Sequence, residues 1–464
     1  MSVSYDPAND SRLPPGPWLP AAAQVAWWLA RPVSMLRAFR HRYGKTFTMR
    51  LAGGVPPLVV FSEPHAVKDI FTGDPHDLYA GEANRVLEPL VGVNSLLLLD
   101  GDRHLAERKL LLPPFHGQRM LAYGEVMKEV ADADIDHWPL GKPFAVHEHL
   151  QAVTLDIIMR TVFGMSSGPT VERLRELLTH TLDVISNPLW LLPFLQRDLG
   201  RLTPWAELTR MSEEIDATLF AEFERRRVEG FEGRDDILSM LMQARYEDGS
   251  ALGDAELRDE MMTLLVAGHE TTTTAMAWTL SLVLQRPDVR SEIARERHEV
   301  CGNDPLDAQA VGKMKYLDAV MREALRLKPV LPMVGRVLQR EMRIGGIDLP
   351  PGVMAVPSIY LTHHNPDVWP DPERFEPRRF LERKVTPYEF FPFGGGVRRC
   401  IGMAFALFEM RIVLAQVLDR VDLSLAPGYK PKLVRRAITF APSRGLPVLA
   451  RAVRPSRRAT SAAA

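Results

Sequence analysis

Apolar residues in the middle of the chain recur every three to four positions, which is the spacing of one face of an α-helix. This pattern dominates from about Arg103 to Leu327, and few glycines interrupt the periodic segments. Short runs with the character of β-strands lie at Thr46–Leu51, Leu58–Phe61, Met342–Ile347 and Ala437–Ala441. The pattern therefore predicts a mainly α protein with small β sheets.

No repeat, linker or shift in composition divides the chain. We therefore expect a single large domain over residues 21–453. Residues 1–20 are predicted to form an N-terminal extension, and the small, basic tail at 454–464 is predicted to be disordered. Prolines become frequent from Asn365 to Pro392, which indicates a long ordered loop.

The first apolar run, Ala21–Ala30, is ten residues long, whereas a helix needs about 20 residues to cross a bilayer. It contains Trp27 and Trp28, which we expect to pack against the body of the protein because large apolar side chains are usually buried. No basic region leads into an apolar core at the N-terminus. Neither a secretory signal nor a transmembrane anchor is therefore expected.

The 464 residues include 57 basic and 58 acidic side chains, for a net charge of −1. This balance is typical of a globular protein and gives no indication of nucleic-acid binding. Cys301 and Cys400 lie too far apart in sequence to suggest a disulfide framework, so we expect a reducing, cytoplasmic location. The chain has no glycine-rich phosphate or dinucleotide motif and no CxxC pair, which argues against those cofactor and metal sites.

Two pairs of histidines are candidate metal ligands. His147 and His149, in VHEHL, could form a strand-like His-x-His pair, but no third ligand is evident. His363 and His364, in LTHHNPD, are adjacent and would point to different sides of most backbones. We expect both pairs to be structural.

The segment FPFGGGVRRCIG surrounds Cys400 with glycines and arginines. A thiolate ligand would explain each neighbour: Gly394–Gly396 and Gly402 let backbone N–H groups approach the sulfur, and Arg398 suits a carboxylate. The residues from Met403 onward have helical period, so Cys400 would precede a helix N-terminus, where the helix dipole favours an anion.

The spacing Phe393-x-x-Gly396-x-Arg398-x-Cys400-x-Gly402 resembles the haem-binding signature of the cytochrome P450 family. The resemblance implies a soluble, bacterial-type member with that family's mainly α fold and a haem b cofactor. Cys400 would be the axial ligand of the haem iron, donating electron density that favours O–O cleavage.

A second motif lies in LLVAGHETTTTAMAW, within a helical run from Asp254 to Arg286 that Pro287 ends. Its four threonines are poor interior helix formers, so the helix is expected to be loosened there. The segment is similar to the central helix of the same family. The resemblance implies that Ala267 and Gly268 make room for dioxygen, while Glu270 and Thr271 form an acid–alcohol pair that delivers protons. His269 lies off that face and is interpreted as a packing or surface residue.

The helix in YLDAVMREALRLKP resembles the family's Glu-x-x-Arg helix through Glu323 and Arg326. Its third member would be Arg374, in DPERF. These residues would hold the long loop that presents Cys400, which makes them structural and not catalytic. A surface ion pair is the alternative interpretation of Glu323 and Arg326 alone.

Haem carries two propionates, and the resemblance implies four side chains that would bind them: His104, Arg108, Arg336 and Arg398. His104 and Arg108 are four residues apart, on one face of a predicted helix. His104 would occupy a position that tryptophan fills in other members of the family.

The implied reaction inserts one oxygen atom from dioxygen into a lipophilic small molecule such as a terpenoid, fatty acid or polyketide. Segments similar to the family's pocket-forming regions are overwhelmingly apolar: Asn84–Leu99, Ser186–Leu195, Val330–Val334 and Ala437–Phe440. The expected pocket residues are Leu264, Ala267, Val330, Val334, Ile438 and Thr439. Arg85 could bind an anionic head group.

Electrons must come from a separate protein, since the chain has no flavin or nicotinamide motif. We expect a ferredoxin-type partner with its reductase, docking near Arg398, Arg399 and Arg411, on a protein that is otherwise a monomer. Two alternatives remain: a haem-thiolate enzyme that uses peroxide, and a haem-binding sensor or carrier without turnover. The Glu270–Thr271 pair argues against both, because a pure binder needs no proton delivery and the peroxide-using relatives usually lack this pair.

Overall fold

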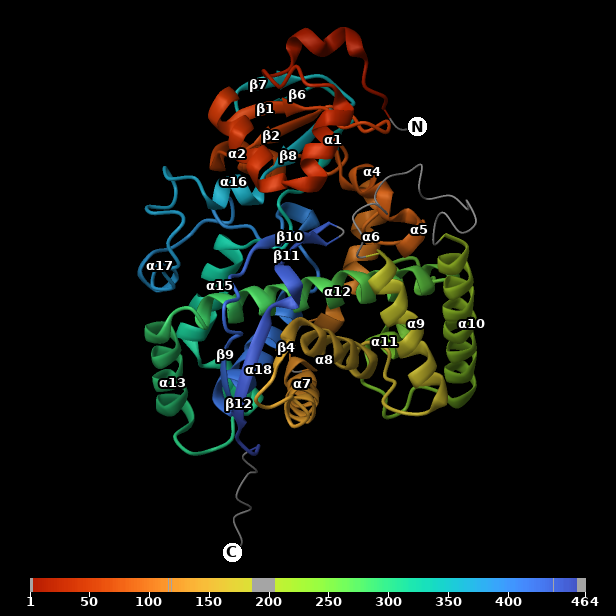
Figure 1. Cartoon of the computed structure of the whole chain (residues 1–464). Coiled ribbons are helices and arrows are strands. Elements are labelled where there is room, and N and C mark those ends of the chain that lie inside the picture. The colour runs from red at the N-terminus through yellow and green to blue at the C-terminus, as the bar shows by residue number, and fades with distance from the viewer. Residues whose placement is uncertain (1–2, 116, 118, 186–204, 437, 457–464) are drawn as a thin grey trace, which may run out of the picture.

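The computed structural model describes residues 3–115, 117, 119–185, 205–436 and 438–456 (Figure 1). The helices are α1 Ala21–Ala30, α2 Pro32–Tyr43, α3 Pro64–Thr72, α4 Ala80–Asn84, α5 Glu88–Val91, α6 Gly101–Leu111, α7 Arg119–Ile135, α8 Val146–Thr161, α9 Pro169–Ile185, α10 Trp205–Glu229, α11 Ile237–Gln243, α12 Asp254–Val283, α13 Pro287–Cys301, α14 Ala308–Gly312, α15 Lys315–Leu327, α16 Ile359–His363, α17 Arg379–Glu382 and α18 Met403–Arg420. The strands are β1 Thr46–Met49, β2 Leu58–Phe61, β3 Leu78–Tyr79, β4 Pro143–Ala145, β5 Arg336–Leu338, β6 Met342–Ile344, β7 Ile347–Leu349, β8 Met354–Pro357, β9 Val421–Leu425, β10 Leu433–Arg436, β11 Thr439–Pro442 and β12 Pro447–Val453.

Helix α12 crosses the middle of the molecule, with α18 below it in the view of Figure 1. The N–H of Gly253 donates to the Glu256 carboxylate at 2.9 Å, which satisfies one backbone donor at the start of the helix. Helix α13 begins at Pro287, so the proline separates the two helices as expected. The predicted run ending at Arg286 therefore ends three residues earlier, at Val283.

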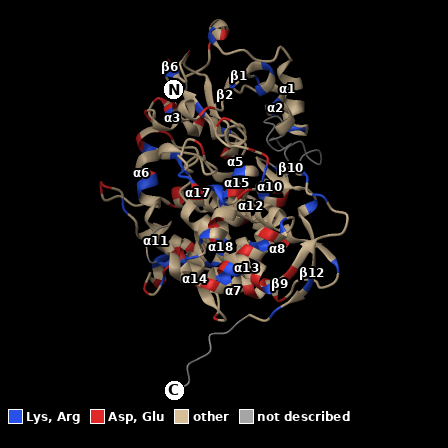
Figure 2. Ribbon diagram, turned by 90° about the vertical axis from the view of Figure 1, so that its left-hand side faces the viewer, with Lys and Arg blue, Asp and Glu red and all other residues tan. Residues whose placement is uncertain are grey.

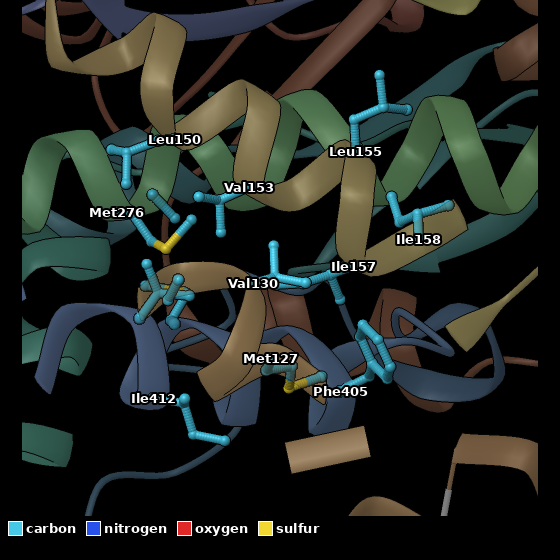
Figure 3. Packing of buried hydrophobic residues seen from close by; sticks show 14 of the residues in the cluster. Met127, Val130, Leu150, Val153, Leu155, Ile157, Ile158, Met276, Phe405 and Ile412 are labelled. Atoms are coloured by element: carbon cyan, nitrogen blue, oxygen red, sulfur yellow. The ribbon is translucent and has the colours of Figure 1, made fainter. Parts of the chain in front are cut away.

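The main core lies between α7, α8, α12 and α18. Figure 3 shows this packing: Met127 and Val130 of α7 face Ile157 of α8 and Phe405 of α18. These side chains are all 7% exposed or less. The apolar faces that the helical period predicted are therefore buried against one another.

The strands form small sheets around this helical body, as predicted. The largest has five strands in the order β1-β2-β8-β5-β3, and the others have two or three. The single strand predicted at Met342–Ile347 is wrong, because that segment is the first part of a β6–β7 hairpin. Gly345 and Gly346 turn the chain there with φ of 57° and 83°, a conformation that favours glycine.

Two other strand predictions differ at their ends. β1 stops at Met49, whereas Leu58–Phe61 has the predicted bounds. β11 begins at Thr439, and Ala437, where the predicted strand began, lies outside the described residues.

The two ends of the domain are attached to its body. Trp27 and Trp28 are half-buried against a core cluster, as expected, with Trp27 edge-on to Phe39 at 5.5 Å. Ser456 donates from Oγ to Asp132 Oδ2 at 2.9 Å, so the predicted tail is bonded to α7 at that point. Residues 457–464, the rest of that tail, lie outside the described part of the chain. None of the helices described is long and apolar enough to cross a membrane.

Candidate active site

The loop around Cys400 is closed by its own backbone. The N–H of Cys400 donates to the carbonyl of Phe393 at 2.9 Å, and the N–H of Gly394 donates to the carbonyl of Phe391 at 3.0 Å. Helix α18 begins at Met403, immediately after Gly402, as the sequence predicts. Cys400 is therefore presented just before a helix N-terminus.

Two of the loop's glycines are required by packing against α3. A Cβ at Gly395 would lie 2.1 Å from the ring of Phe71, and one at Gly396 would lie 2.2 Å from the Phe71 carbonyl oxygen. Gly396 also has a φ of 64°. A Cβ at Gly402, in contrast, would meet nothing within 4 Å. The sequence interpretation, clearance around the sulfur, thus omitted the main constraint on Gly395 and Gly396.

The surroundings of the Cys400 sulfur have opposing effects on its charge. Burial raises the pKa of the thiol, while the N–H of Gly402 and the charges of Arg108 and Arg399 lower it. The side chain is nevertheless exposed to a solvent-sized probe. A sulfur that is accessible yet close to an N–H donor and two arginine charges fits a thiolate ligand.

The threonine-rich part of α12 presents small residues. Ala267 is exposed, and Leu264 and Thr271 are half-buried on the same helical face. The Thr271 hydroxyl donates to the carbonyl of Ala267 at 2.5 Å, which draws that carbonyl into a side-chain hydrogen bond. A Cβ at Gly268 would lie 3.4 Å from Ile158 of α8, so this glycine also allows the two helices to approach closely.

Glu270 faces away from Thr271. Its carboxylate accepts from Gln151 Nε2 at 3.1 Å and lies 3.2 Å from Arg436 Nε, on β10. Burial raises the pKa of Glu270, and the Arg436 charge opposes that rise. Within the described part of the chain, no hydrogen bond joins Glu270 to Thr271, so the predicted acid–alcohol pair is adjacent in sequence but not in contact.

The histidines predicted to be structural are held among side chains of α7, α8 and α12. The strand-like His147–His149 pair is wrong, because both residues lie on α8 and point to different sides. His149 lies 3.2 Å from Asp134, whereas His147 is buried beside Glu270. His269 is buried and lies 3.0 Å from the carbonyl of Gln151, so it is a packing residue. No cluster of three or more metal-ligating side chains occurs among the residues described.

Glu323 and Arg326 form a fully buried pair with N–O distances of 2.7 and 2.8 Å, which excludes a surface ion pair. The predicted third member, Arg374, is wrong, because its side chain is 62% exposed and pairs with Glu376. Arg379 supplies the second guanidinium, with its Nε 3.4 Å from Glu323. The arginine-rich stretch EPRRF, just after DPERF, was the available signal, but only packing shows which guanidinium reaches Glu323.

His363 connects this pair to the Cys400 loop. Arg326 donates to the carbonyl of His363 at 2.8 Å, and the N–H of Phe391 donates to His363 Nε2 at 3.0 Å. Burial lowers the pKa of His363 well below its usual value, which keeps the ring neutral and able to accept. Sequence reasoning identified His363 only as structural and missed this link.

The four side chains expected to bind propionates lie together. Burial lowers the pKa of His104 to about 3, and the charges of Arg398, Arg108 and Arg336 lower it further. Burial also lowers the pKa of Arg336 to about 9, with a further contribution from Arg398. His104 Nδ1 is buried and, among the described residues, has no hydrogen-bond partner.

One carboxylate was not foreseen in this cluster. Asp100 forms an ion pair with Arg398, which also donates to the carbonyl of Leu96 at 3.2 Å. Among the described residues, Arg336 donates a hydrogen bond only to the neighbouring Gly335 carbonyl, although the charge of Asp100 acts on it, and Arg108 has no ion pair. Buried cations without carboxylates are costly. The residues present therefore fit a group that brings two carboxylates of its own, as haem does.

The expected pocket residues are only partly accounted for. Val330 is buried, its carbonyl accepting from the N–H of Phe440 at 2.8 Å, and Val334 is half-buried. The Thr439 hydroxyl is bonded to the Arg436 carbonyl at 2.9 Å, and Ile438 is half-buried. The predicted pocket segment Ser186–Leu195 lies outside the described residues.

Known proteins place this site in a family. Residues 13–446 match the sequence profile of the cytochrome P450 family. The chain is 40% identical to the protein named cytochrome P450 135B1 of Mycobacterium tuberculosis, covering 95% of this chain and 92% of that protein, and 34% identical to cytochrome P450 135A1 of the same species, covering 93% and 94%. Among solved structures, the retinoic acid-bound cyanobacterial CYP120A1 matches with a TM-score of 0.83 at 27% identity, over 95% of this chain and 99% of that chain. The chain therefore belongs to the cytochrome P450 family, the haem-thiolate monooxygenases that use a haem iron, dioxygen and electrons from a redox partner.

Proposed function

We propose that this P450 inserts one oxygen atom from dioxygen into a lipophilic small molecule, and that the thiolate of Cys400 would hold the iron of a haem b group. The observation that carries the proposal is the convergence on Cys400 of a helix N-terminus, the Gly402 N–H and the charges of Arg108 and Arg399. When bound, haem supplies the activation of dioxygen and the transfer of one oxygen atom to the substrate.

Cations on α6, β5 and the Cys400 loop would hold the propionates. Arg108 and Arg336 are the strongest candidates, because neither has a carboxylate partner among the described residues. Arg398 already forms an ion pair with Asp100, so we propose that it contributes to the propionate site together with the other cations and does not bind one propionate alone. His104 stays neutral and would add one N–H donor.

Thr271 and Glu270 would divide proton delivery between them. Thr271 lies on the half-exposed face of α12 with Ala267, the face at which dioxygen is expected. Its hydroxyl would donate a proton there. Burial raises the pKa of Glu270, so it keeps its proton to higher pH than an exposed glutamate does, which favours a role as a proton donor. Ordered water would bridge the two side chains.

Replacement of Thr271 by Ala tests this assignment. The variant should consume reductant at a rate near that of the wild type while releasing hydrogen peroxide in place of product. The measurement is the ratio of product to reductant consumed, with Thr209→Ala as a control, since that exposed threonine only bonds the carbonyl of Trp205 within α10. Unchanged coupling in Thr271→Ala would favour the peroxide-using or non-catalytic alternatives.

The substrate is proposed to be lipophilic, of the size of a terpenoid, fatty acid or polyketide. Leu264, Val330 and Val334 supply apolar side chains along the expected pocket. The retinoic acid bound by the cyanobacterial neighbour is itself an apolar chain with a carboxylate. Arg85, on the surface 3.8 Å from Glu88, is the cation available to such a head group.

A ferredoxin-type partner with its reductase would supply the electrons to a monomeric, cytoplasmic enzyme. Figure 2 shows acidic and basic residues interspersed along the ribbon, so a docking surface must be a local feature. Arg399 is exposed beside the Cys400 loop, whereas Arg411 is bonded to Asp318 and is less available. Arg399→Glu should slow reduction by the ferredoxin several-fold, whereas Arg343→Glu, an exposed arginine of the β6–β7 hairpin, should not. An unchanged reduction rate in Arg399→Glu would contradict the proposal that the ferredoxin binds near Arg399.

A further inference from the structure

A stripe of polar side chains runs along the otherwise apolar inner face of α8. His147, Gln151 and Thr154 lie at positions i, i+4 and i+7, which places them on one side of the helix. His147 is 1% exposed and Thr154 is fully buried. The stripe faces α12, the helix against which α8 makes its most extensive packing.

Polar side chains of α12 contact this stripe. Thr154 Oγ1 lies 2.9 Å from Thr273 Oγ1, and Gln151 bonds His269 through its carbonyl and Glu270 through its amide. We call these six residues the α8–α12 polar seam: His147, Gln151 and Thr154 of α8 with His269, Glu270 and Thr273 of α12.

One member of the seam is unsatisfied. Neither ring nitrogen of His147 has a partner at hydrogen-bond distance and angle among the described residues, although the Gln151 side chain lies close enough to favour the protonated ring. Its Nε2 instead lies 3.7 Å from Oε1 of Glu270, about 0.5 Å beyond the usual hydrogen-bond distance. Burying an imidazole without a partner costs free energy.

We propose that His147 is a positioning residue for Glu270: its neutral imidazole donates a hydrogen bond from Nε2–H to the carboxylate that Glu270 becomes after giving up a proton. No proton is transferred to His147 in this step. The proposal rests on the proposed role of Glu270 in proton delivery and extends it to a residue on a different helix.

The groups around Glu270 fit this role. Arg436 of β10 supplies positive charge at 3.2 Å, and Thr274 can donate from its hydroxyl at 3.4 Å. Asp183 of α9 opposes ionisation of Glu270. His147 remains neutral because burial lowers its pKa to about 3; the charges of Arg436 and His269 add to the effect, and the Gln151 side chain opposes it. It is therefore a donor that introduces no second charge into the cluster.

Helix registration is the competing explanation, since buried polar pairs can fix how two helices align. It predicts that loss of His147 lowers stability and leaves proton delivery unchanged. The present proposal predicts a change in proton delivery, because the Glu270 carboxylate loses a donor. A readout of that delivery, and not of stability, separates the two.

The test compares His147→Leu, His147→Gln and His149→Leu in the haem-loaded enzyme. In His147→Leu the carboxylate of Glu270 is less stable, so its pKa rises and it holds its proton more tightly. The ratio of product to reductant consumed should fall by up to about tenfold at pH 7, and its pH profile should move to higher pH by about one unit. His147→Gln, which keeps an N–H donor, should restore most of the coupling. His149→Leu, on the same helix but paired with Asp134, should match the wild type.

A second readout does not depend on turnover. In the diamagnetic carbon monoxide complex of the reduced enzyme, labelled with ¹⁵N-histidine, the ring resonances of His147 should shift in Glu270→Gln and those of His149 should not. Absence of that shift would overturn the proposal, and this measurement remains decisive even if His147→Leu fails to fold. The thiolate spectrum of the carbon monoxide complex should be unchanged in every folded variant.

The proposed proton route and the role of His147 predict different results. If Glu270→Gln and Thr271→Ala both couple like the wild type, the proposed proton route is wrong. If Glu270→Gln loses coupling but His147→Leu behaves like His149→Leu, only the role of His147 is overturned. If His147→Leu loses stability with an unchanged pH profile, the seam is a device for helix registration.

Discussion

Two groups of buried polar side chains differ in the length of their contacts: those that support the Cys400 loop, which are Glu323, Arg326 and His363, and those around Glu270 in the α8–α12 polar seam. Arg326 donates to the Glu323 carboxylate at 2.7 and 2.8 Å. Arg326 also donates to the carbonyl of His363 at 2.8 Å, and His363 Nε2 accepts from the N–H of Phe391 at 3.0 Å. Around Glu270, in contrast, the contacts are 3.1 to 3.7 Å long.

The difference corresponds to the work each region is proposed to do. A metal ligand must stay in place, so most of its supports are short hydrogen bonds, and the Arg379 contact with Glu323 at 3.4 Å is the longest of them. An acid that gives up and regains a proton needs partners for both of its charge states, and loosely placed donors serve both. The comparison predicts that substitutions of the residues that support the Cys400 loop mainly reduce stability, whereas substitutions in the seam mainly reduce coupling.

The largest effect is expected from Glu323→Ala, because it leaves Arg326 and Arg379 without their buried carboxylate. The free energy of unfolding should fall by about 3–5 kcal/mol, and the protein should retain little haem. Denaturant unfolding measures the loss. Arg374→Ala is the matched control: its exposed side chain forms an ion pair with Glu376, and its carbonyl, which accepts from Arg326, is kept in the variant, so the loss should cost less than about 1 kcal/mol. Equal losses in the two variants would contradict the assignment of Arg379 as the third member.

A smaller loss of stability is expected from His363→Leu, which leaves the N–H of Phe391 without an acceptor. At pH 8 the cost should be about 1–3 kcal/mol. The folded-state pKa of His363 is depressed, so below about pH 6.5 the unfolded wild type binds a proton that the folded protein does not. Wild-type stability then falls by about 1.4 kcal/mol per pH unit from this group, while the leucine variant lacks that slope.

Unfolding of both proteins between pH 5 and 8 checks this expectation. The stability gap between wild type and His363→Leu should narrow as the pH falls. A gap that stays constant over the range would show that His363 is not held neutral in the folded protein.

The smallest effect on stability is expected in the seam, from Gln151→Leu. It removes one hydrogen bond of 3.1 Å to Glu270 but not the backbone carbonyl that His269 contacts. The cost should be about 0.5–1.5 kcal/mol, while the ratio of product to reductant consumed should fall several-fold. A variant that lost as much stability as Glu323→Ala, with normal coupling, would remove the distinction between the two regions.

Sequence alone predicted the parts of the site that depend on neighbours in the chain. Cys400 stands before α18, and Thr271 lies on α12, because helix periods and glycine-rich turns are local signals. The residues that were missed or misassigned depend on contacts between distant segments: Phe71 against Gly395 and Arg379 against Glu323. No local pattern carries that information.

The same limit applies to the histidines. VHEHL looked like a strand-type pair, yet α8 turns His147 toward Glu270 and His149 toward Asp134, 3.7 and 3.2 Å away. The spacing of His147, Gln151 and Thr154 at helical period was present in the sequence. It gains meaning only once α12 is known to lie opposite.

The central claim is that Cys400 is the thiolate ligand of a haem iron, and the carbon monoxide difference spectrum of the reduced protein tests it most directly. The wild type should show the strongly red-shifted band of a thiolate-ligated haem, and Cys400→His should bind haem but lose that band. A wild-type spectrum without the red-shifted band, or a Cys400→His variant that keeps it, would contradict the account.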